Sequence, residues 1–549
     1  TSNICTAQSL LAIISSFYAV YHGSSGLTKI ARRIVIFRRH LELCLKKLGL
    51  VVKDAARFDS FDIYTEKSTQ IHQAALEAGF NLRILPLGAD IENAKGFGIS
   101  IDEVTDESEI FKILEFIGSV FDKEIDFRKI PIDYFFELEG LPLRDDNFMS
   151  QEIFENYRSE TELMRYIFHL SEKDFSLVDG MMPLGSCTMK LNSAAELNPI
   201  SWQEFSLIHP FAPKSQTKGY SQIITDLEKW ICEIVGLQAV SFQPNAGSQG
   251  EFAGLLAIKS YFISKNDYVR KKCLIPSSAH GTNPASAVMA GFEVVSVSCD
   301  EQGNIDFDDL SKKLKEFGSQ IAALMLTYPS THGVFELRIR EICELVHNIG
   351  GFVYLDGANL NAQVGLCKPG EYGIDVCHLN LHKTFCIPHG GGGPGVGPVA
   401  VSETLRPFLP DFSLSNVFIN NTSYSVSSAQ FGSASILPIS WMYIKMSGMQ
   451  GLKKSSMQAI LSANYIAFIL KTKFKILYKG QNGFVAHECI LDFRDLKQKT
   501  GLTVNDIAKR LIDYSFHAPT VSWPVAETIM IEPTESESLR EIDRFCDAM

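Results

Sequence analysis

The chain has 549 residues, of which 46% are hydrophobic and 21% charged, and its formal net charge at pH 7 is −12. This composition is typical of a soluble globular protein of several domains, and no apolar run reaches the ~18 residues that a membrane-spanning helix needs. The acidic balance argues against nucleic acid as a partner, because binding a phosphate backbone requires a basic surface.

The first 140 residues read as an α+β domain that opens directly in a helical pattern. The chain begins at Thr1 without a methionine and without a basic targeting segment, and it stops at Met549 inside another helical pattern. We therefore expect both ends to be cut.

A spaced pattern of five residues near the start recurs 425 residues later, which indicates an internal duplication. The pairs are Tyr18 and Tyr443, Gly23 and Gly448, Gly26 and Gly451, Leu27 and Leu452, and Lys29 and Lys454. Two similar helix–glycine–helix segments could also arise by chance. In a duplication, residues 1–140 would close a first copy whose beginning is missing, and their helices would expose apolar faces.

The middle of the chain alternates short β-rich runs with helical stretches, which is typical of an α/β sandwich with a mainly parallel sheet and helices on both faces. The expected strands are Ala239–Phe242, Cys273–Ile275, Glu293–Val297, Ile321–Thr327, Phe352–Leu355 and Val376–Leu381. Helices are expected between them, for example at Phe252–Ser264 and Ile339–His347. We place the large α/β domain at residues 160–432, a linker at 141–159 and a second α+β domain at 433–549.

Ligands gather at the carboxyl ends of the strands in such sheets. This rule selects Gln243–Gln249, Ser277–Asn283, Tyr328–Gly333 with Thr331, Asp356–Asn359 and His382–Lys383. We expect these segments to share one binding site.

Lys383 is the only lysine or arginine in the stretch 378–398, and it follows an apolar run where an unpaired charge is costly to bury. Desolvation favours a free amine that can form a Schiff base, although a lysine that reaches solvent or pairs with a carboxylate would look the same. Asp356 directly follows another apolar run, where a buried carboxylate could pair with a protonated pyridine nitrogen or simply cap a helix. Together the two residues suggest an enzyme that uses pyridoxal phosphate (PLP).

A phosphate site is expected where a turn of small residues leads into a helix. Backbone amides of Ala246, Gly247, Ser248 and Gln249 would point at an anion, and the Ser248 hydroxyl could donate a hydrogen bond. His280 follows another strand and could stack on a flat aromatic ring. An ordinary Asn/Gly turn and a structural histidine are the alternatives.

Two other patterns carry no cofactor chemistry. Gly390, Gly392 and Gly395 spell G-x-G-x-x-G, but they lead into a strand-like run, so we interpret them as close backbone packing and not as a dinucleotide site. The twelve cysteines include no Cys-x-x-Cys pair, so we expect reduced thiols of an intracellular protein and no metal site.

Long motifs between residues 181 and 538 resemble the glycine decarboxylase (P-protein) family of the glycine cleavage system. In chain order they are "MMPLGSCTMKLN", "QPNAGSQGEFAG", "IPSSAHGTNPASA", "YPSTHGVFE", "VYLDGANLNAQVG", "HLNLHKTFCIPHGGGGPG", "GSASILPISW" and "FHAPTVSWPVAETIMIEPTESES". The resemblance implies a fold-type I PLP enzyme with glycine dehydrogenase (aminomethyl-transferring) activity. Such an enzyme decarboxylates glycine and passes the aminomethyl group to the lipoyl arm of the H-protein.

The resemblance also implies roles for single residues. Lys383 is similar to the lysine that holds PLP covalently, Asp356 to the partner of the pyridine nitrogen and His280 to the ring-stacking residue. Lys383 and His280 are therefore expected to be catalytic. Thr331 and His382 are expected to contact the cofactor.

The turn at residues 246–249 departs from the family's usual spelling, which is Asn-Ser-Gly-Ala-Gln from residue 245 onward. Here Ala246 and Ser248 have exchanged character. Which hydroxyl meets the phosphate is therefore open.

The family is built from two related halves or two subunits, and "TSNICTAQSLLA" resembles the end of the first half. The implied partners are glycine, the lipoylated H-protein and an N-terminal half or companion subunit, in a complete homodimer or heterotetramer without nucleic acid or membrane. The implied compartment is the cytoplasm of a bacterium or the mitochondrial matrix of a eukaryote. Two alternatives to this function remain. The chain could be another PLP-dependent amino-acid decarboxylase, or an inactive fragment that needs a partner for assembly.

Overall fold

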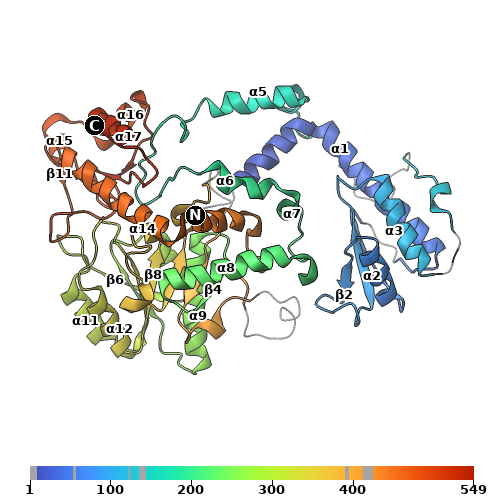
Figure 1. Cartoon of the computed structure of the whole chain (residues 1–549), viewed down its shortest axis with the longest axis horizontal. Coiled ribbons are helices and arrows are strands. Elements are labelled where there is room, and N and C mark those ends of the chain that lie inside the picture. Colours follow the sequence, from blue (N-terminus) through green and yellow to red (C-terminus); the bar gives the residue numbers. More distant parts are fainter. Residues whose placement is uncertain are drawn as a thin grey trace. The chain divides into compact units, whose positions relative to one another are not determined.

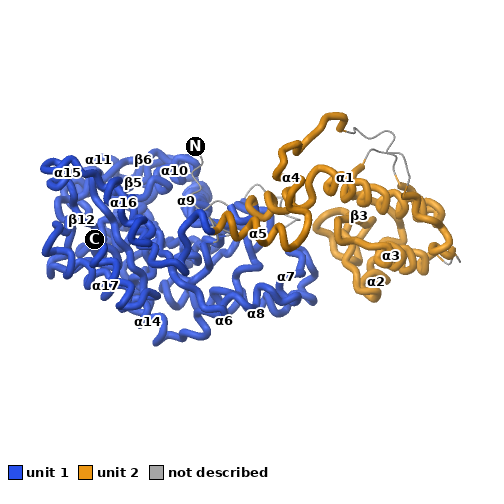
Figure 2. The backbone as a smooth tube through the Cα atoms, turned by 90° about the horizontal axis from the view of Figure 1, so that it is seen from above, with its two compact units in different colours: residues 1–11, 172–412, 421–549 blue, residues 12–171, 413–420 orange. Residues whose placement is uncertain are grey.

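The computed structural model describes residues 9–52, 57–121, 123, 125–134, 144–389, 395–411 and 424–549. Figure 2 shows its two compact units. The larger unit comprises residues 1–11, 172–412 and 421–549, and the smaller one comprises residues 12–171 and 413–420. Predictions that concern residues 1–8 and most of the glycine run, residues 390–394, lie outside the described residues.

A seven-stranded sheet forms the centre of the larger unit, in the order β4-β10-β9-β8-β7-β5-β6. Its strands are β4 (Ala239–Ser241), β5 (Lys272–Pro276), β6 (Glu293–Val297), β7 (Ile321–Thr327), β8 (Phe352–Gly357), β9 (Val376–Leu379) and β10 (Val399–Val401). Strands β6, β5, β7, β8 and β9 run parallel, and β10 pairs antiparallel with β9 and β4. The predicted α/β fold with a mainly parallel sheet is confirmed.

Helices cover both faces of this sheet, as Figure 1 shows, because its strands are apolar on both sides. The main helices are α8 (Lys218–Val235), α9 (Gly247–Ser264), α10 (Thr282–Met289), α11 (Phe307–Phe317) and α12 (Ile339–Asn348), with short α6 (Ala194–Leu197), α7 (Gln203–Ser206) and α13 (Leu381–Thr384). In β7, Leu324 and Leu326 pack in the core that includes α8, α11 and α12. Ala323 and Met325 pack in a second core with α9 and α10. Successive side chains of β7 thus point to opposite faces of the sheet, and a layer of helices packs on each face.

The C-terminal part of the larger unit adds an antiparallel sheet in the order β11-β12-β14-β13. Its elements are α14 (Leu437–Leu470), β11 (Lys475–Ile476), β12 (Cys489–Asp492), α15 (Arg494–Thr500), α16 (Val504–Asp513), β13 (Thr520–Val521), β14 (Thr528–Ile531) and α17 (Leu539–Ala548). Leu491, Phe516 and Phe545 are fully buried in a core separate from those of the large sheet. The predicted domain limits at residues 140, 160 and 432 stay predictions.

The smaller unit contains a three-stranded antiparallel sheet in the order β1-β3-β2. Its elements are α1 (Ser9–Lys47), β1 (Ser60–Tyr64), α2 (Ser68–Glu77), β2 (Arg83–Leu85), β3 (Gly96–Ser100), α3 (Glu107–Ser119), α4 (Ile153–Asn156) and α5 (Glu160–Ser171). Leu41, Phe97 and Leu114 are fully buried in its core. Ile14 and Leu43 of α1 stay exposed.

The two long helices α1 and α14 break at the glycines that the sequence repeat pairs. Gly23 has φ 57° and ψ −175°, and Gly448 has φ 59° and ψ −179°. This backbone region is essentially restricted to glycine. Each helix then leads into a small antiparallel sheet, so the break supports the internal duplication indicated by the sequence.

The structure departs from the sequence prediction at the end of β9. A strand was expected through Leu381, but β9 ends at Leu379, and His382 and Lys383 lie in the one-turn helix α13. The Lys383 and Thr384 backbone N–H groups both donate to the Asn380 carbonyl oxygen, at 2.9 and 3.0 Å, so a local turn replaces the strand ladder. Within the described ranges, no helix combines the length and the hydropathy that a bilayer crossing requires.

Candidate functional site

A cavity lies at the carboxyl ends of β7, β8 and β9, next to the start of α9. Seven residues that the sequence predicts for the site line it: Gly247, Ser248, His280, Thr331, Asp356, His382 and Lys383. Ala246 and Gln249 do not line it. Ala246 precedes α9, and the Gln249 side chain accepts the Asn245 backbone N–H at 2.7 Å. Parallel strands bring these separate segments to one edge of the sheet.

Lys383 lies on α13, directly beyond β9, and its Nζ donates a hydrogen bond to the Ser186 carbonyl oxygen at 2.7 Å. The neighbouring Leu381 and Thr384 are buried and fix the helical turn. The loop that carries Ser186 is itself held by the C-terminal sheet, because Thr520 Oγ1 donates to the Gly185 carbonyl oxygen at 2.6 Å. A loop 197 residues earlier in the chain therefore positions the amine.

Asp356, at the end of β8, is buried and surrounded by hydrogen-bond donors. Its carboxylate accepts from Asn283 Nδ2 and from the Ala358 backbone N–H, each at 3.0 Å, and it lies 3.2 Å from His378 Nε2. Burial alone would raise the pKa of Asp356, but His378, with these two donors, holds it well below its usual range. The side chain is thus an ionised carboxylate in the protein interior.

His378 on β9 lies between a tyrosine hydroxyl and the Asp356 carboxylate, which favours its charged form. The Tyr354 hydroxyl lies 3.0 Å from the Gly250 carbonyl oxygen and 3.1 Å from His378 Nδ1. The other ring nitrogen faces the Asp356 carboxylate. Burial lowers the pKa of His378, but Asp356 more than reverses this, and the net shift is upward.

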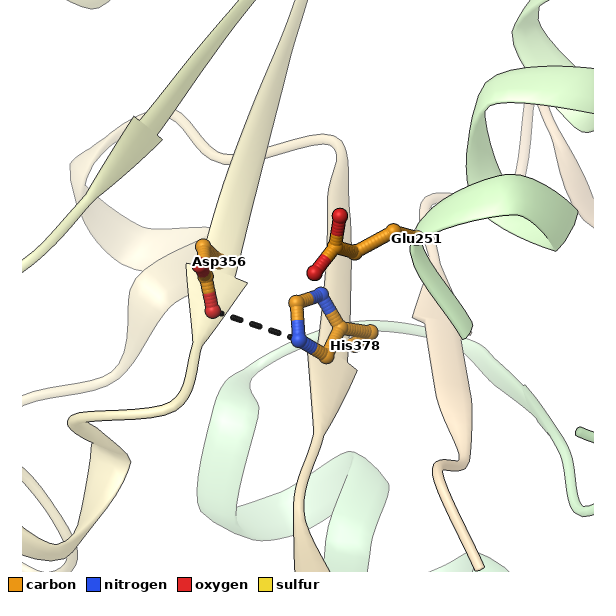
Figure 3. Close-up of side chains that lie close together, drawn as sticks. All are labelled: Glu251, Asp356 and His378. Carbon is orange, nitrogen blue, oxygen red and sulfur yellow. Dashed lines mark ion pairs between the residues drawn. The ribbon is translucent and has the colours of Figure 1, made fainter. Parts of the chain in front are cut away.

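Glu251 on α9 completes a buried trio with Asp356 and His378, and Figure 3 shows the three side chains pointing toward one another. Burial raises the pKa of Glu251, although His378 opposes the shift. Glu251 is therefore harder to ionise than a free glutamic acid, and it lies beside the Asp356–His378 ion pair.

His280 lies beyond β5 and lines the cavity. Its Nδ1 lies 2.9 Å from Thr282 Oγ1 and 3.2 Å from the Thr282 backbone nitrogen, so the first turn of α10 holds the ring in place. Burial lowers the pKa of His280. Its ring meets that of Trp523 edge-on, with ring centroids 5.7 Å apart.

The two remaining predicted residues are buried at the cavity wall. The Thr331 hydroxyl donates to the Ser278 carbonyl oxygen. Burial lowers the pKa of His382 well below its ordinary value, and its ring centroid lies 4.9 Å from that of His389.

The first turn of α9 has the features of an anion cradle. A Cβ at Gly247 would collide with Asn380 Oδ1, and a Cβ at Gly250 would lie 2.7 Å from the Gly397 carbonyl oxygen. Ser248 Oγ is buried and has no hydrogen-bond partner among the described residues. Free helix amides, a tight backbone and an unpartnered hydroxyl fit a phosphate group, so the residues present fit PLP.

Sequence reasoning missed Ser186, Glu251, His378 and Trp523, whereas Asn283 lies at the end of a segment that the strand-end rule selected. A signal existed for His378, because it lies on a predicted strand whose register places it opposite Asp356. Ser186 and Trp523 carry no such signal, because they come from irregular segments that only tertiary packing brings to the cavity.

A comparison with known families matches residues 1–117 and 144–411 to the glycine cleavage system P-protein family. The chain belongs to this family. Residues 455–549 match the C-terminal domain of glycine dehydrogenase. The resemblance that the motifs indicate is therefore confirmed.

Curated P-protein relatives named glycine dehydrogenase (decarboxylating) cover the whole chain. Those of Prochlorococcus marinus strains NATL2A and SARG are 59% and 60% identical to it. That of Parasynechococcus marenigrum WH8102 is 58% identical. The chain spans only 57% of the length of these relatives.

Solved structures share the fold of this P-protein family member. An inhibitor-bound glycine decarboxylase (P-protein) has a TM-score of 0.61 at 15% identity and covers 81% of this chain and 98% of its own. An L-threonine transaldolase from Pseudomonas fluorescens has a TM-score of 0.54 at 15% identity, over 70% of this chain and 86% of its own. The predicted fold-type I class of PLP-dependent enzymes is confirmed.

Proposed function

We propose that this chain carries the PLP site of a glycine decarboxylase and decarboxylates glycine, with transfer of the aminomethyl group to the lipoyl arm of the H-protein. The observation that carries the proposal is one cavity that joins the Lys383 amine, the Asp356 carboxylate and the α9 cradle. The names of the relatives support the same reaction.

The roles proposed for the residues follow from their positions. Lys383 Nζ would hold PLP covalently, Asp356 would keep the pyridine nitrogen protonated, and the α9 amides with Ser248 would bind the phosphate. His280 would cover the ring. PLP, when bound, supplies the sink for the electrons that remain when carbon dioxide leaves.

The partners proposed are glycine, the lipoylated H-protein and the part of the relatives that the chain does not span, either in the same chain or as a companion subunit. A homodimer or a heterotetramer is the proposed assembly. Location in a bacterial cytoplasm or a mitochondrial matrix stays a prediction. Supplying the remaining part of a relative should raise PLP affinity and glycine turnover, whereas an unchanged turnover would mean that residues 12–171 need no such partner.

The assignment of Lys383 is tested by trapping the cofactor. After incubation with PLP and borohydride reduction, peptide mass spectrometry should find the added mass on Lys383 and no covalent PLP in Lys383→Ala. Lys190 is the matched control, because it is buried nearby but bound to Glu535 at 2.7 Å. An adduct on Lys190 with Lys383 unmodified would contradict the proposal.

The substrate is tested by exchange of labelled bicarbonate into the carboxyl group of amino acids. Glycine should exchange faster than alanine or larger amino acids. Faster exchange with a larger amino acid would favour another PLP-dependent decarboxylase, and no exchange in the complete protein would favour an inactive assembly fragment.

A further inference from the structure

A second buried cluster, distinct from the Asp356 trio, joins His487, Glu488 and Glu532. Glu488 and His487 directly precede β12, and Glu532 directly follows β14. All three are at most 1% exposed, and one ligand atom from each lies within 4.8 Å of the others. Two carboxyl groups are thus packed together in a dry interior.

Ser186 connects this cluster to the cavity. Its hydroxyl lies 2.9 Å from both carboxyl oxygens of Glu488, and its backbone oxygen accepts the hydrogen bond of Lys383 Nζ. Ser186 also lines the cavity. A single residue therefore touches the buried acid, the amine and the space where substrate would react.

Burial raises the pKa of both carboxyl groups of the cluster. Burial and Glu532 raise the pKa of Glu488 well above its ordinary value, while Ser186 and Lys383 oppose the shift only in part. Burial raises the pKa of Glu532 to about 7, although the Thr188 hydroxyl, Lys383 and Lys190 oppose the shift, and Glu535 acts in the same direction as burial.

His487 does not neutralise the pair. Burial lowers its pKa to about 3, helped by Lys383 and Lys190, so its ring is uncharged at neutral pH. Neither ring nitrogen has a hydrogen-bond partner among the described residues, and the nearer carboxyl oxygen, on Glu532, lies 3.8 Å from Nε2. Two carboxyl groups without a cation of their own cannot both ionise so close together.

The proposed reaction consumes one proton. The bond from the glycine carbon to its carboxylate breaks and carbon dioxide leaves, and the electron pair left on carbon forms a C–S bond to one sulfur of the lipoyl disulfide. The S–S bond breaks, and the second sulfur leaves with its electron pair and must be protonated. Glycine, disulfide and one proton thus give carbon dioxide, the aminomethyl thioether and a free thiol.

We propose that Glu488, kept protonated by Glu532, stores this proton and delivers it into the cavity through the Ser186 hydroxyl. The hydroxyl passes its own hydrogen to the acceptor and takes the hydrogen of Glu488. Solvent then restores the proton to the Glu488–Glu532 pair after turnover. This step rests on the proposed function, because it needs the disulfide of the lipoyl arm as acceptor.

The protonation state is tested without turnover. The infrared absorbance of protonated carboxyl groups, recorded at neutral pH on the 549-residue chain, should lose one component in Glu488→Gln. Glu527→Gln is the matched control in the same sheet, because Lys497 holds Glu527 ionised at 2.7 Å and lowers its pKa. Equal spectra of Glu488→Gln and wild type would overturn the proposal.

The role in turnover is tested in the protein completed with the remaining part of a relative. Glu488→Gln should retain the absorbance of bound PLP and its change on adding glycine, yet transfer to lipoylated H-protein about 100-fold more slowly, as expected when a proton donor is removed. The wild-type transfer rate should fall as pH rises and the pair ionises, whereas that of Glu488→Gln should be flat over this range.

Two other outcomes separate the proposals. Equal transfer rates of Glu488→Gln and wild type overturn the proton store and leave the proposed function standing. A wild-type protein that shows no spectral change with glycine overturns the proposed function, and the proton delivery with it.

Discussion

Two buried clusters near Lys383 each combine one histidine with two carboxylic acids, and they differ in which groups are charged. Glu251, His378 and Asp356 include a carboxylate paired with an imidazolium. His487, Glu488 and Glu532 include two carboxyl groups with raised pKa values beside a neutral imidazole. Residue type alone therefore does not decide which buried acid is ionised.

The difference lies in the hydrogen-bond donors. Asp356 is met by an amide side chain, a backbone N–H and the imidazole of His378, whose pKa it raises in turn. Glu488 is met by the Ser186 hydroxyl and by the charge of Glu532, whereas Glu532 accepts from the Thr188 hydroxyl and, at 3.5 Å, from Asn361 Nδ2. Several close donors favour a negative charge in a protein interior, and Asp356 has more of them than either glutamate of the second cluster has among the described residues.

Removing the charge of the first cluster should have the largest effect. Asp356→Asn keeps the shape but cannot hold the pyridine nitrogen protonated, so glycine–bicarbonate exchange should fall by ~10²–10³-fold. The PLP adduct on Lys383 should still form. Exchange near the wild-type rate would mean that Asp356 serves only as a cap.

Replacing Glu532 of the second cluster, whose pKa is raised by burial, should change how the stability of the protein depends on pH. The folded pKa of Glu532 is raised from 4.5 to about 7. Its contribution to the free energy of unfolding is therefore fully present below about pH 4.5. That contribution is lost as pH rises toward 7, by about 1.4 kcal/mol per pH unit. Glu532→Gln should remove this slope, measured as the free energy of unfolding in denaturant at about pH 5 and about pH 8. An unchanged slope would mean that Glu532 ionises freely in the folded protein.

Removing the imidazolium should have a smaller effect that depends on pH. His378→Gln keeps a donor but no charge, so the pKa of Asp356 should rise and exchange should fall about tenfold, the equivalent of one pKa unit. The loss should deepen as pH falls, because Asp356 then takes up a proton. A loss that is the same at every pH would assign His378 to packing alone.

The sequence predicts the strands of the large sheet and several of the residues at their carboxyl ends. The observed limits of β6 and β7 equal the predicted ones, and in β7 the run Ile321–Leu326 is apolar throughout. Lys383, Asp356, His280 and Thr331 lie in one cavity as expected, because the carboxyl ends of parallel strands converge.

The second cluster lay beyond sequence reasoning. Ser186 and Glu488 are 302 residues apart, and Glu532 comes from another strand of an antiparallel sheet. No rule of strand direction brings such positions together, so only the packed structure does. The turn of α13 was missed for a local reason, since two N–H groups share the Asn380 carbonyl and the pattern of apolar residues carries no trace of it.

Gly23 and Gly448 have nearly the same backbone angles but different surroundings, so the same substitution can be compared at two places in one chain. A methyl group at Gly448 would meet no described atom within 4 Å, whereas one at Gly23 would collide with Arg158 and the Phe154 carbonyl oxygen. Gly448→Ala therefore measures the strain of the backbone alone, of order 1–3 kcal/mol, and Gly23→Ala measures the same strain plus crowding. The difference between the two losses of unfolding free energy gives the cost of the steric clash at Gly23, because the backbone angles at the two positions are nearly the same.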